Sequence, residues 1–297
     1  MNRTASVKNA GNWLGCFAFA APAVLFYILF VVVPIFGTVN ISFHRWNGAS
    51  PGMIFIGLEN YRRIFTDPVF YRAIGNNVIW ILFTIFVPVF LGLILATLIS
   101  RPFVKAKLLY RLTYFMPNVV SLVAVGIVWG WIYNPVFGIL ERFLVATGIP
   151  GADRIDFLGD PNLVIWSLVI AGSWTAFGFN MTVFLAAIQG IDNDYLEVAI
   201  LEGANFVQIF VHVIVPAIKG TITLLVLNSL IGSFKVFDII MIMTKGGPYH
   251  SSEVVSTYMY SRAFLMNEYG YGAAVAIVLA VVIAVCSTLY MRAMEKE

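Results

Sequence analysis

The chain has 297 residues, of which 60% are hydrophobic and 11% charged, and its mean hydropathy is +0.89. Soluble domains average about 25% charged residues, so too few polar side chains remain here to cover a water-soluble core, and soluble enzymes are excluded. The 18 basic and 15 acidic residues form no basic stripe, which argues against nucleic acid as a partner. Two cysteines inside apolar runs and three scattered histidines predict neither a metal site nor a catalytic dyad. The composition is that of an integral membrane protein.

Stretches of about 20 apolar residues predict membrane-spanning helices, because hydrocarbon offers the backbone no hydrogen-bond partner outside the helix. Five stretches contain no charged residue, and a sixth is interrupted only by Lys235 and Asp238. The first stretch is too long for a cleavable signal peptide, so we expect it to remain as a helix. The sequence therefore predicts one all-α integral membrane domain, residues 1–297, with six transmembrane helices. The predicted spans are 13–39, 75–99, 112–133, 162–187, 221–244 and 270–291.

The loop charges bear on the orientation of the chain. With the N-terminus inside, the cytoplasmic segments hold nine Lys and Arg residues and the outer loops hold eight, so the count alone decides nothing. Basic residues close to span ends carry most of the positive-inside effect, and the densest cluster, Arg101 to Arg111, lies between the second and third spans. This cluster favours a cytoplasmic position for that loop, which puts both termini in the cytoplasm.

The loop 192–218 between the fourth and fifth spans has helix signals of its own. Asp194 followed by Glu197 resembles a capping box, and the helix that follows is expected to stop at Gly203, where a residue without Cβ suits a left-handed cap. This first arm carries Ala199, which allows close approach, beside the apolar side chains of Leu196, Ile200 and Leu201. Such a surface predicts a docking partner.

A second arm follows in the same loop. Asn205 with Gln208 repeats the start signal, and Pro216 ends or kinks the helix before the next span. The loop is therefore predicted to form a bent helical elbow.

The elbow carries a resemblance to a known family. Its residues resemble the EAA motif of binding-protein-dependent ABC importer permeases, with the spacing of the motif kept throughout: Glu197, Val198, Ala199, Gly203, Val213, Val215 and Pro216. Val198, Val213 and Val215 replace Ala, Ile and Leu of the motif, which are small changes in apolar volume. Other stretches resemble the sugar-permease branch, which contains the maltose and glycerol-phosphate permeases: 55–61 with Phe70, 109–117, 133–138 and 233–248. The resemblance covers nearly the whole chain.

This resemblance implies type I ABC importer permease architecture and a pore subunit of an ATP-driven, binding-protein-dependent importer of a sugar or sugar derivative. It implies a place in the bacterial cytoplasmic (inner) membrane and a cytoplasmic elbow, the coupling loop, gripped by a separate ATPase. The implied coupling residues are Glu197, Ala199, Leu201, Gly203 and Pro216. The chain has no Gly-x-x-x-x-Gly-Lys-Ser/Thr segment, so we expect no enzyme activity and no cofactor on it, with ATP and Mg²⁺ bound by partner subunits.

The resemblance also implies the partners of the chain. They are a second, different permease subunit, two ATPase subunits, an extracytoplasmic solute-binding protein and the lipid bilayer.

Two stretches are candidates to line a substrate path. The fourth span holds a polar and aromatic patch that includes Thr175, Phe179 and Asn180. Sugar hydroxyls need hydrogen-bond partners and sugar C–H faces stack on aromatic rings, so this mixture suits a sugar. Resemblance to the maltose permease adds Ala176 to this patch and aligns a second lining stretch that contains Phe234, Lys235 and Asp238. Trp46 and Trp80 are expected in core or membrane-interface positions.

Lys235 and Asp238 leave three interpretations open. They are three residues apart on one predicted helix face, so they can neutralise each other as a structural pair. Lys235 can instead contact an acid-bearing sugar, or the pair can serve a proton relay in a secondary transporter. A membrane-embedded enzyme acting on lipid-linked substrates would use clustered acids, but Asp153, Asp156 and Asp160 are more simply a solvated outer loop.

Overall fold

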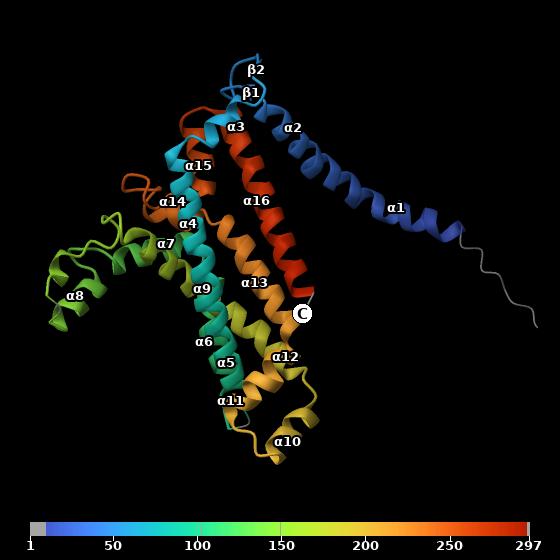
Figure 1. The fold of residues 1–297 in the computed structure, drawn as a ribbon, viewed down its shortest axis with the longest axis vertical. Coiled ribbons are helices and arrows are strands. Elements are labelled where there is room, and N and C mark those ends of the chain that lie inside the picture. The colour runs from blue at the N-terminus through green and yellow to red at the C-terminus, as the bar shows by residue number, and fades with distance from the viewer. Residues whose placement is uncertain (1–9, 102, 149, 296–297) are drawn as a thin grey trace, which may run out of the picture.

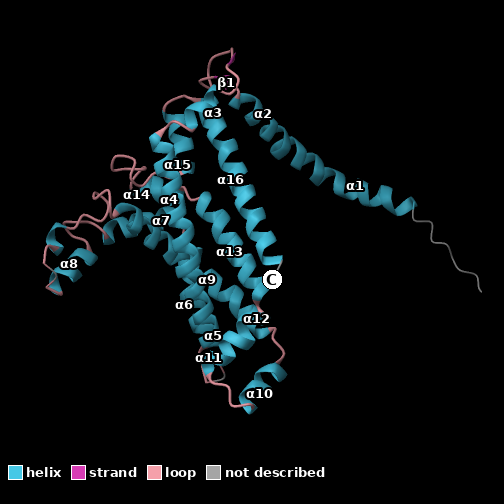
Figure 2. Ribbon diagram, viewed as in Figure 1, coloured by secondary structure: helices cyan, strands magenta, loops and turns pink. Residues whose placement is uncertain are grey.

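The structure is a computed structural model that describes residues 10–101, 103–148 and 150–295. Apart from one short hairpin, β1 (His44–Arg45) paired antiparallel with β2 (Ile54–Phe55), every element of the described chain is helical. Long helices run side by side between two ends, one carrying the hairpin and α3 and the other carrying α10 (Figure 1). The loops gather mainly at these ends and around α8 and α14 (Figure 2).

Five spans are long and apolar enough to cross a membrane in the described chain: Ala18–Ser42, Pro68–Ser100, Val164–Gln189, Lys219–Met243 and Tyr269–Glu295. They are built from α1 (Ala10–Tyr27), η1 (Ile28–Val32) and α2 (Val33–Ser42); α4 (Pro68–Thr84), η2 (Ile85–Val89) and α5 (Phe90–Ser100); α9 (Val164–Gln189); α13 (Lys219–Phe234) and α14 (Asp238–Met243); and α16 (Tyr269–Glu295). A sixth crossing is available if the bent pair α6 (Lys107–Val119) and α7 (Leu122–Ile132) counts as one span.

The third predicted span, 112–133, is not one straight helix. Helices α6 and α7 meet at 94°. Pro117 lies in the last turn of α6, Val120 is extended, and the Ser121 hydroxyl accepts from the Val123 amide to start α7 anew. A proline without an amide donor followed by a fresh N-cap explains the bend.

The shorter elements connect the spans at the two ends. Toward the hairpin end lie α3 (Glu59–Ile64), α15 (Val255–Tyr260) and η5 (Ser261–Leu265), whereas α8 (Ile139–Ala146), followed by η3 (Ala152–Arg154), projects from the side of the bundle. At the opposite end lie α10 (Asn193–Leu201), α11 (Phe206–Ile209), η4 (Phe210–Ile214) and α12 (Val215–Ala217). The turns η1, η2 and η4 are π-helical, and each contains or directly precedes a proline-bearing turn, where a missing amide donor loosens the helical ladder.

The helices α5, α6 and α9 pack closely because two glycines let their backbones meet. A Cβ on Gly92 of α5 would lie 2.8 Å from the Asn180 Cβ of α9. A Cβ on Gly178 of α9 would lie 1.8 Å from the Tyr114 carbonyl oxygen of α6. These contacts hold α9 at the centre of the bundle, where it positions the candidate site.

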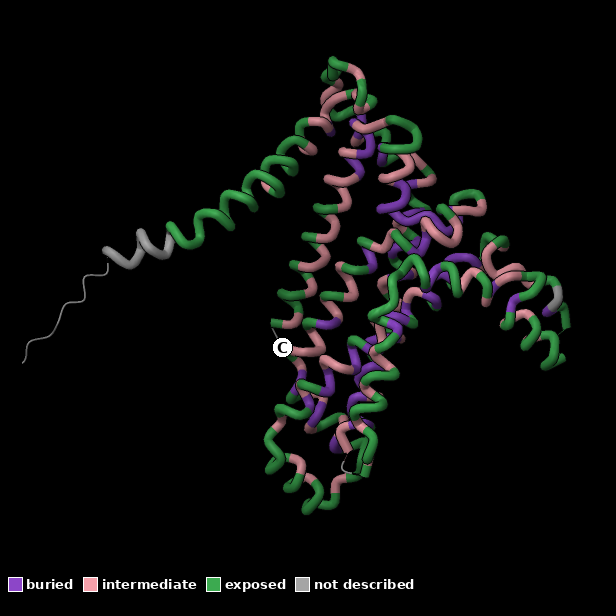
Figure 3. The backbone as a smooth tube through the Cα atoms, turned by 180° about the vertical axis from the view of Figure 1, so that it is seen from behind, coloured by how far each residue is buried: buried purple, intermediate pink, exposed green. Residues whose placement is uncertain are grey.

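The first span meets the bundle only at one end. Helix α2 contacts α16 near the hairpin, α1 runs away from the other helices (Figure 1), and none of the residues in the apolar window of this span is buried. Seen from behind, the colour of exposed residues covers most of the described part of this span (Figure 3). The remaining apolar core consists of three clusters between the other helices.

Candidate functional site

A cavity of about 330 Å³ lies between α4, α7, α9 and the junction of α13 with α14. It brings together six of the seven substrate-path residues predicted from the sequence: Thr175, Ala176, Phe179, Asn180, Lys235 and Asp238. The seventh, Phe234, is buried and does not line the cavity. Because α9 is a 26-residue span and its lining residues lie near its middle, the cavity sits at mid-depth of that helix.

The α9 wall of the cavity mixes fixed polar groups with an open aromatic ring. The Thr175 hydroxyl donates to the Gly172 carbonyl, and the Asn118 amide donates to the Thr175 carbonyl at 3.3 Å. Asn180 is 3% exposed and Phe179 is 36% exposed. One face of a single helix therefore supplies both a hydrogen-bonding amide and a ring that a sugar face can stack on.

The opposite wall comes from a helix break. Lys235 caps the C-terminal end of α13, and Asp238 is the first residue of α14, so Val236 and Phe237 interrupt the predicted span 221–244. The two ionisable residues are consequently not on one helix face, and within the described chain they form no ion pair. The expectation of a mutually neutralising pair is wrong. Both side chains are exposed and line the cavity separately.

Trp80 belongs to the apolar core, as predicted, and also lines the same cavity. Its side chain is 3% exposed, and its ring packs so closely on α9 that a Cβ on Gly172 would lie 2.7 Å from it. Its indole Nε1–H is buried without a hydrogen-bond partner in the described structure. A second unpredicted set of polar lining groups is Thr84, Asn228, Ser229 and Ser233. Recurrent Ser, Thr and Asn inside apolar spans are the signal that could have found them.

The coupling loop forms the predicted elbow, but its first helix starts at a different residue. Asp192, not Asp194, caps α10 by accepting from the Asp194 amide, so the helix starts earlier than the predicted capping box allows. Gly203 has a φ of +79°, as the left-handed stop requires. The second capping box is confirmed, because Asn205 and Gln208 exchange side-chain to backbone hydrogen bonds.

The two faces of α10 differ. Leu196 and Ala199 pack against the apolar core formed by α5, α9 and α11, so Ala199 turns toward its own bundle and not outward as expected. Tyr195, Val198 and Leu201, spaced three apart, are exposed, and Leu201 is 86% exposed. The outward face of the elbow is thus apolar and uncovered in the chain alone.

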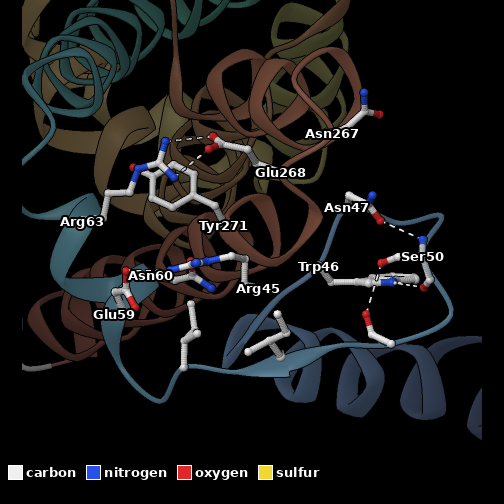
Figure 4. A pocket seen from close by; sticks show the side chains of 13 residues that line it. Arg45, Trp46, Asn47, Ser50, Glu59, Asn60, Arg63, Asn267, Glu268 and Tyr271 are labelled. Carbon is white, nitrogen blue, oxygen red and sulfur yellow. Dashed lines mark hydrogen bonds and ion pairs between the residues drawn. The ribbon is translucent and has the colours of Figure 1, made fainter.

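The opposite end of the molecule carries a second, larger cavity of about 520 Å³. Figure 4 shows Trp46, Asn47 and Ser50 from the β1–β2 loop on one side and Arg63 with Tyr271 on the other. The Trp46 indole donates to the Ser50 carbonyl at 2.9 Å, which fixes the ring. We call this cavity the outer pocket. Its charged lining residues are joined in two ion pairs, Arg45 with Glu59 and Arg63 with Glu268.

Beside the outer pocket, polar side chains from distant parts of the chain form what we call the outer clasp. Asp67, the N-cap of α4, accepts from the Tyr258 hydroxyl at 2.6 Å and from Arg262 at 2.9 Å. Burial acts to raise the pKa of Asp67, but the hydrogen bonds from Tyr258 and the Val69 amide and the charge of Arg262 outweigh it, so the pKa lies below its ordinary value of 3.8. Asp67 is therefore ionised at neutral pH.

Close to the clasp, the loop after α14 buries an acidic side chain. Glu253 is 4% exposed and pairs with His250 three residues earlier. Burial raises the pKa of Glu253 above its ordinary value, while His250 acts in the opposite direction. The Asn76 amide donates to the Ser251 and Glu253 carbonyls, which ties this loop to α4.

Known proteins resemble the chain over most of its length. Residues 88–296 match the family described as "Binding-protein-dependent transport system inner membrane component". The chain is 37% identical to the probable ABC transporter permease protein YurN of Bacillus subtilis, over 93% of this chain and 94% of that protein. It is 32% identical to the lactose transport system permease protein LacF of Rhizobium radiobacter, over 97% of this chain and 95% of that protein.

A solved structure shares the fold. A chain from the crystal structure of a bacterial ABC transporter that imports the acidic polysaccharide alginate superposes with a TM-score of 0.84, at 24% identity, over 96% of each chain. The family match and the relatives do not favour the secondary-transporter alternative, since they are permeases of ABC transporters.

These comparisons agree with the helical spans described above. The protein belongs to the binding-protein-dependent transport system inner membrane component family, in its sugar-permease branch, and is a multi-pass inner-membrane permease subunit of an ABC transporter, not the enzyme that hydrolyses ATP.

Proposed function

We propose that the 330 Å³ cavity is the point at which this permease holds a sugar or sugar derivative during ATP-driven import. The observation that carries the proposal is the meeting of Phe179 and Asn180 from α9 with Lys235 and Asp238 from the α13–α14 break around one space. Hydroxyl-rich cargo needs amide and hydroxyl partners and a ring to stack on, and this lining supplies them. Relatives named for lactose and for starch degradation products support the cargo class.

Because Lys235 lines the cavity, the proposed substrates include acidic sugars. Its ammonium group has no ion-pair partner in the described structure and faces the cavity, so a carboxylate on the cargo would give it one. Asp238 on the same wall keeps the lining neutral overall, which leaves room for uncharged sugars as well.

The coupling loop is the proposed binding site for the partner ATPase. The exposed apolar face of α10, Tyr195, Val198 and Leu201, is uncovered in the chain alone and would be buried in the cleft of an ATPase subunit. Movement of α10 would then pass to α9 and α13 through the left-handed joint at Gly203 and the turn at Pro216. ATP and Mg²⁺ would be bound by two such partner subunits and not by this chain.

The first span and the outer pocket are proposed to bind two further partner proteins. The first span, whose apolar window holds no buried residue, would pack on a second, different permease subunit, because α1 gains little from its own bundle. The outer pocket, at the end opposite the elbow, would receive a loop of a solute-binding protein outside the cell; a structural neighbour is described in complex with a substrate-bound periplasmic protein. This arrangement puts the elbow and both termini in the cytoplasm.

The test is uptake by the assembled transporter in proteoliposomes. Phe179→Ala and Lys235→Gln change exposed cavity residues, so folding should be retained while sugar uptake falls at least tenfold, with the Lys235 variant affecting acidic sugars most. Ile170→Val, on the exposed face of α9 away from the cavity, is the matched control. Unchanged uptake of every sugar tested in both cavity variants would overturn the cavity assignment.

A further inference from the structure

Two side chains from other helices hold the break between α13 and α14, which forms one wall of the cavity. A helix end leaves its last carbonyl groups without partners inside the helix, so within a packed bundle they need donors from elsewhere. The Asn77 amide of α4 donates to the Ser233 carbonyl at 2.8 Å, in the last turn of α13. The Ser256 hydroxyl of α15 donates to the Val236 carbonyl, inside the break itself. Both carbonyls belong to residues that line the cavity.

Asn77 suits its place because the place needs both a donor and an acceptor. Its side chain is fully buried, its Nδ2 donates to the Ser233 carbonyl, and its Oδ1 accepts from the Val255 amide at 2.9 Å. A backbone amide only donates and a carbonyl only accepts, so the side chain between them must offer one group of each kind. The Ser233 hydroxyl makes a further contact, 2.8 Å from the Thr84 hydroxyl. The end of α13 is thus hydrogen-bonded to α4 at two points.

The short helix α15 contacts both this break and the outer clasp. Ser256 and the amide that Asn77 binds both lie in its first turn. The Tyr260 ring meets the Phe237 ring of the break edge-on, with 5.2 Å between the ring centres. In the same helix, the Tyr258 hydroxyl donates to the carboxylate of the clasp at 2.6 Å. One helix of six residues therefore connects the cavity wall to the outer end of the bundle.

Neighbouring polar side chains are also buried but bond to the loop before α15 instead. The Asn76 amide donates to two carbonyls of that loop, those of Ser251 and Glu253. The Ser251 hydroxyl donates to the Pro248 carbonyl of the same loop. Asn76 and Ser251 are buried, like the two side chains that reach the break. The contacts that hold the loop are thus distinct from the two that hold the break.

We propose that Asn77 and Ser256 are positioning residues for the substrate cavity: they keep the α13–α14 break in a fixed place, so that Lys235 and Asp238 face the cargo. The proposal rests on the proposed function of the cavity and deepens it. The α9 wall of the cavity leads into the elbow, whereas the wall formed by the break is tied through α15 to the outer clasp. Movement of the elbow would then change the cavity by moving one wall against another that stays in place.

The cargo selectivity of the assembled transporter tests this. Uptake in proteoliposomes is compared for two sugars that differ only in a hydroxymethyl or a carboxylate group, a glucoside and the matching glucuronoside. Asn77→Leu and Ser256→Ala remove the two contacts without adding charge. Asn76→Leu and Ser251→Ala are the matched controls, with the same changes outside the break. In the first two variants the ratio of acidic to neutral sugar uptake should fall about fivefold, because a displaced Lys235 loses a charge-assisted contact with the carboxylate.

The uptake ratio separates a positioning role from a purely structural one. A variant that merely folds or assembles less well takes up both sugars more slowly by the same factor, so the two controls should keep the ratio of the unchanged protein within about twofold. Ser256→Thr keeps the hydroxyl and should keep the ratio as well. Ser256→Ala removes a single hydroxyl, so it decides the question even if Asn77→Leu does not assemble.

Two results would refute the positioning role. One is a ratio in Ser256→Ala that is no lower than in Ser251→Ala, and the other is an equal fall of the ratio in Ser256→Thr. Lys235→Gln distinguishes this failure from failure of the proposed function. If Lys235→Gln lowers the ratio and Ser256→Ala does not, only the positioning role is wrong. If Lys235→Gln and Phe179→Ala both leave the uptake of the two sugars unchanged, the cavity assignment itself is wrong.

Discussion

At the outer end of the bundle, Asp67 accepts hydrogen bonds from Tyr258 and Arg262, and Glu268 accepts two from Arg63. At the opposite end, the acidic side chains of the elbow, Asp194, Glu197 and Glu202, form no ion pair within the described chain. The outer clasp and the Arg63–Glu268 pair together tie α3 and the start of α4 to α15, η5 and the residue before α16, by contacts between residues about 190 to 205 apart in sequence. The elbow is held by local caps and by one apolar face.

This difference in contacts predicts that the two ends of the bundle differ in rigidity. Contacts between distant segments resist separation of the helices that make them, whereas local caps stabilise short helices without fixing how they lie on the bundle. We therefore expect the outer end to keep its shape while the elbow moves as a capped unit. The cavity between them is lined by α9, whose C-terminal end leads into the elbow.

Gly203→Pro gives the largest expected effect, because it acts on the joint of the moving end. Proline fixes φ near −65°, and the position requires +79°. Binding-protein-stimulated uptake should fall at least fiftyfold while the thermal stability of the bundle, measured by the apparent melting temperature, changes little. Gly220→Ala is the control, since Gly220 lies just beyond the elbow with no atom near its would-be Cβ. Normal uptake in the proline variant would show that the elbow does not transmit movement.

The elbow was also the part most accessible from sequence. Its signals act between residues three to five apart, as with Asn205 and Gln208, so no knowledge of distant segments is needed. The error at the start of α10 arises because Asp192 and Asp194 are both good N-caps and only the earlier one has the required extended backbone. The outer clasp left no comparable signal, since nothing in the sequence near Asp67 points to Tyr258 or Arg262.

The cavity could be predicted from the sequence in part, less fully than the elbow and better than the outer clasp. Thr175, Phe179 and Asn180 share one helix face, so their grouping follows from helical periodicity alone. The place of Trp80 depends on how closely α4 approaches Gly172 of α9, which is a tertiary contact that periodicity does not determine. The break at Val236 and Phe237 likewise separates Lys235 from Asp238 in a segment whose apolar run predicts one continuous helix.

Gly270→Ala tests the rigidity assigned to the outer end. A Cβ at this position would lie 1.9 Å from the His44 carbonyl oxygen, so the start of α16 would have to move off the hairpin. We expect a loss of about 3 kcal/mol and an apparent melting temperature lower by several degrees. Gly75→Ala, at an open position inside α4, should cause no loss. Equal stability of the two variants would mean that the hairpin end is as loose as the elbow.

Arg262→Met removes the cation of the clasp and leaves its apolar contacts. The side chains of Arg262 and Asp67 are largely buried, so the remaining carboxylate would lose its charged partner in a poorly solvated place. The expected cost is about 2 kcal/mol, seen as a lower apparent melting temperature with coupling to the ATPase retained. Arg45→Met is the matched control, because the Arg45–Glu59 pair is mostly exposed and should contribute little. Comparable losses in both variants would contradict a special role for the clasp.

Acidification should weaken the clasp selectively, and this is the smallest effect we expect. The pKa of Asp67 is lower in the folded protein than its ordinary value of 3.8, so the stability from its ionised form is fully present above that value and is lost as the pH falls through the folded pKa. The difference in apparent melting temperature between the unchanged protein and Asp67→Asn should therefore be constant from pH 7 down to about pH 5 and then shrink.

Glu253 acts in the opposite direction, because its pKa is raised by burial and its protonation on acidification relieves a buried charge. Repeating the titration in a Glu253→Gln background separates the two groups: if the shrinkage persists there, Asp67 is its source, and if it vanishes, the acid response belongs to the loop after α14 and not to the clasp.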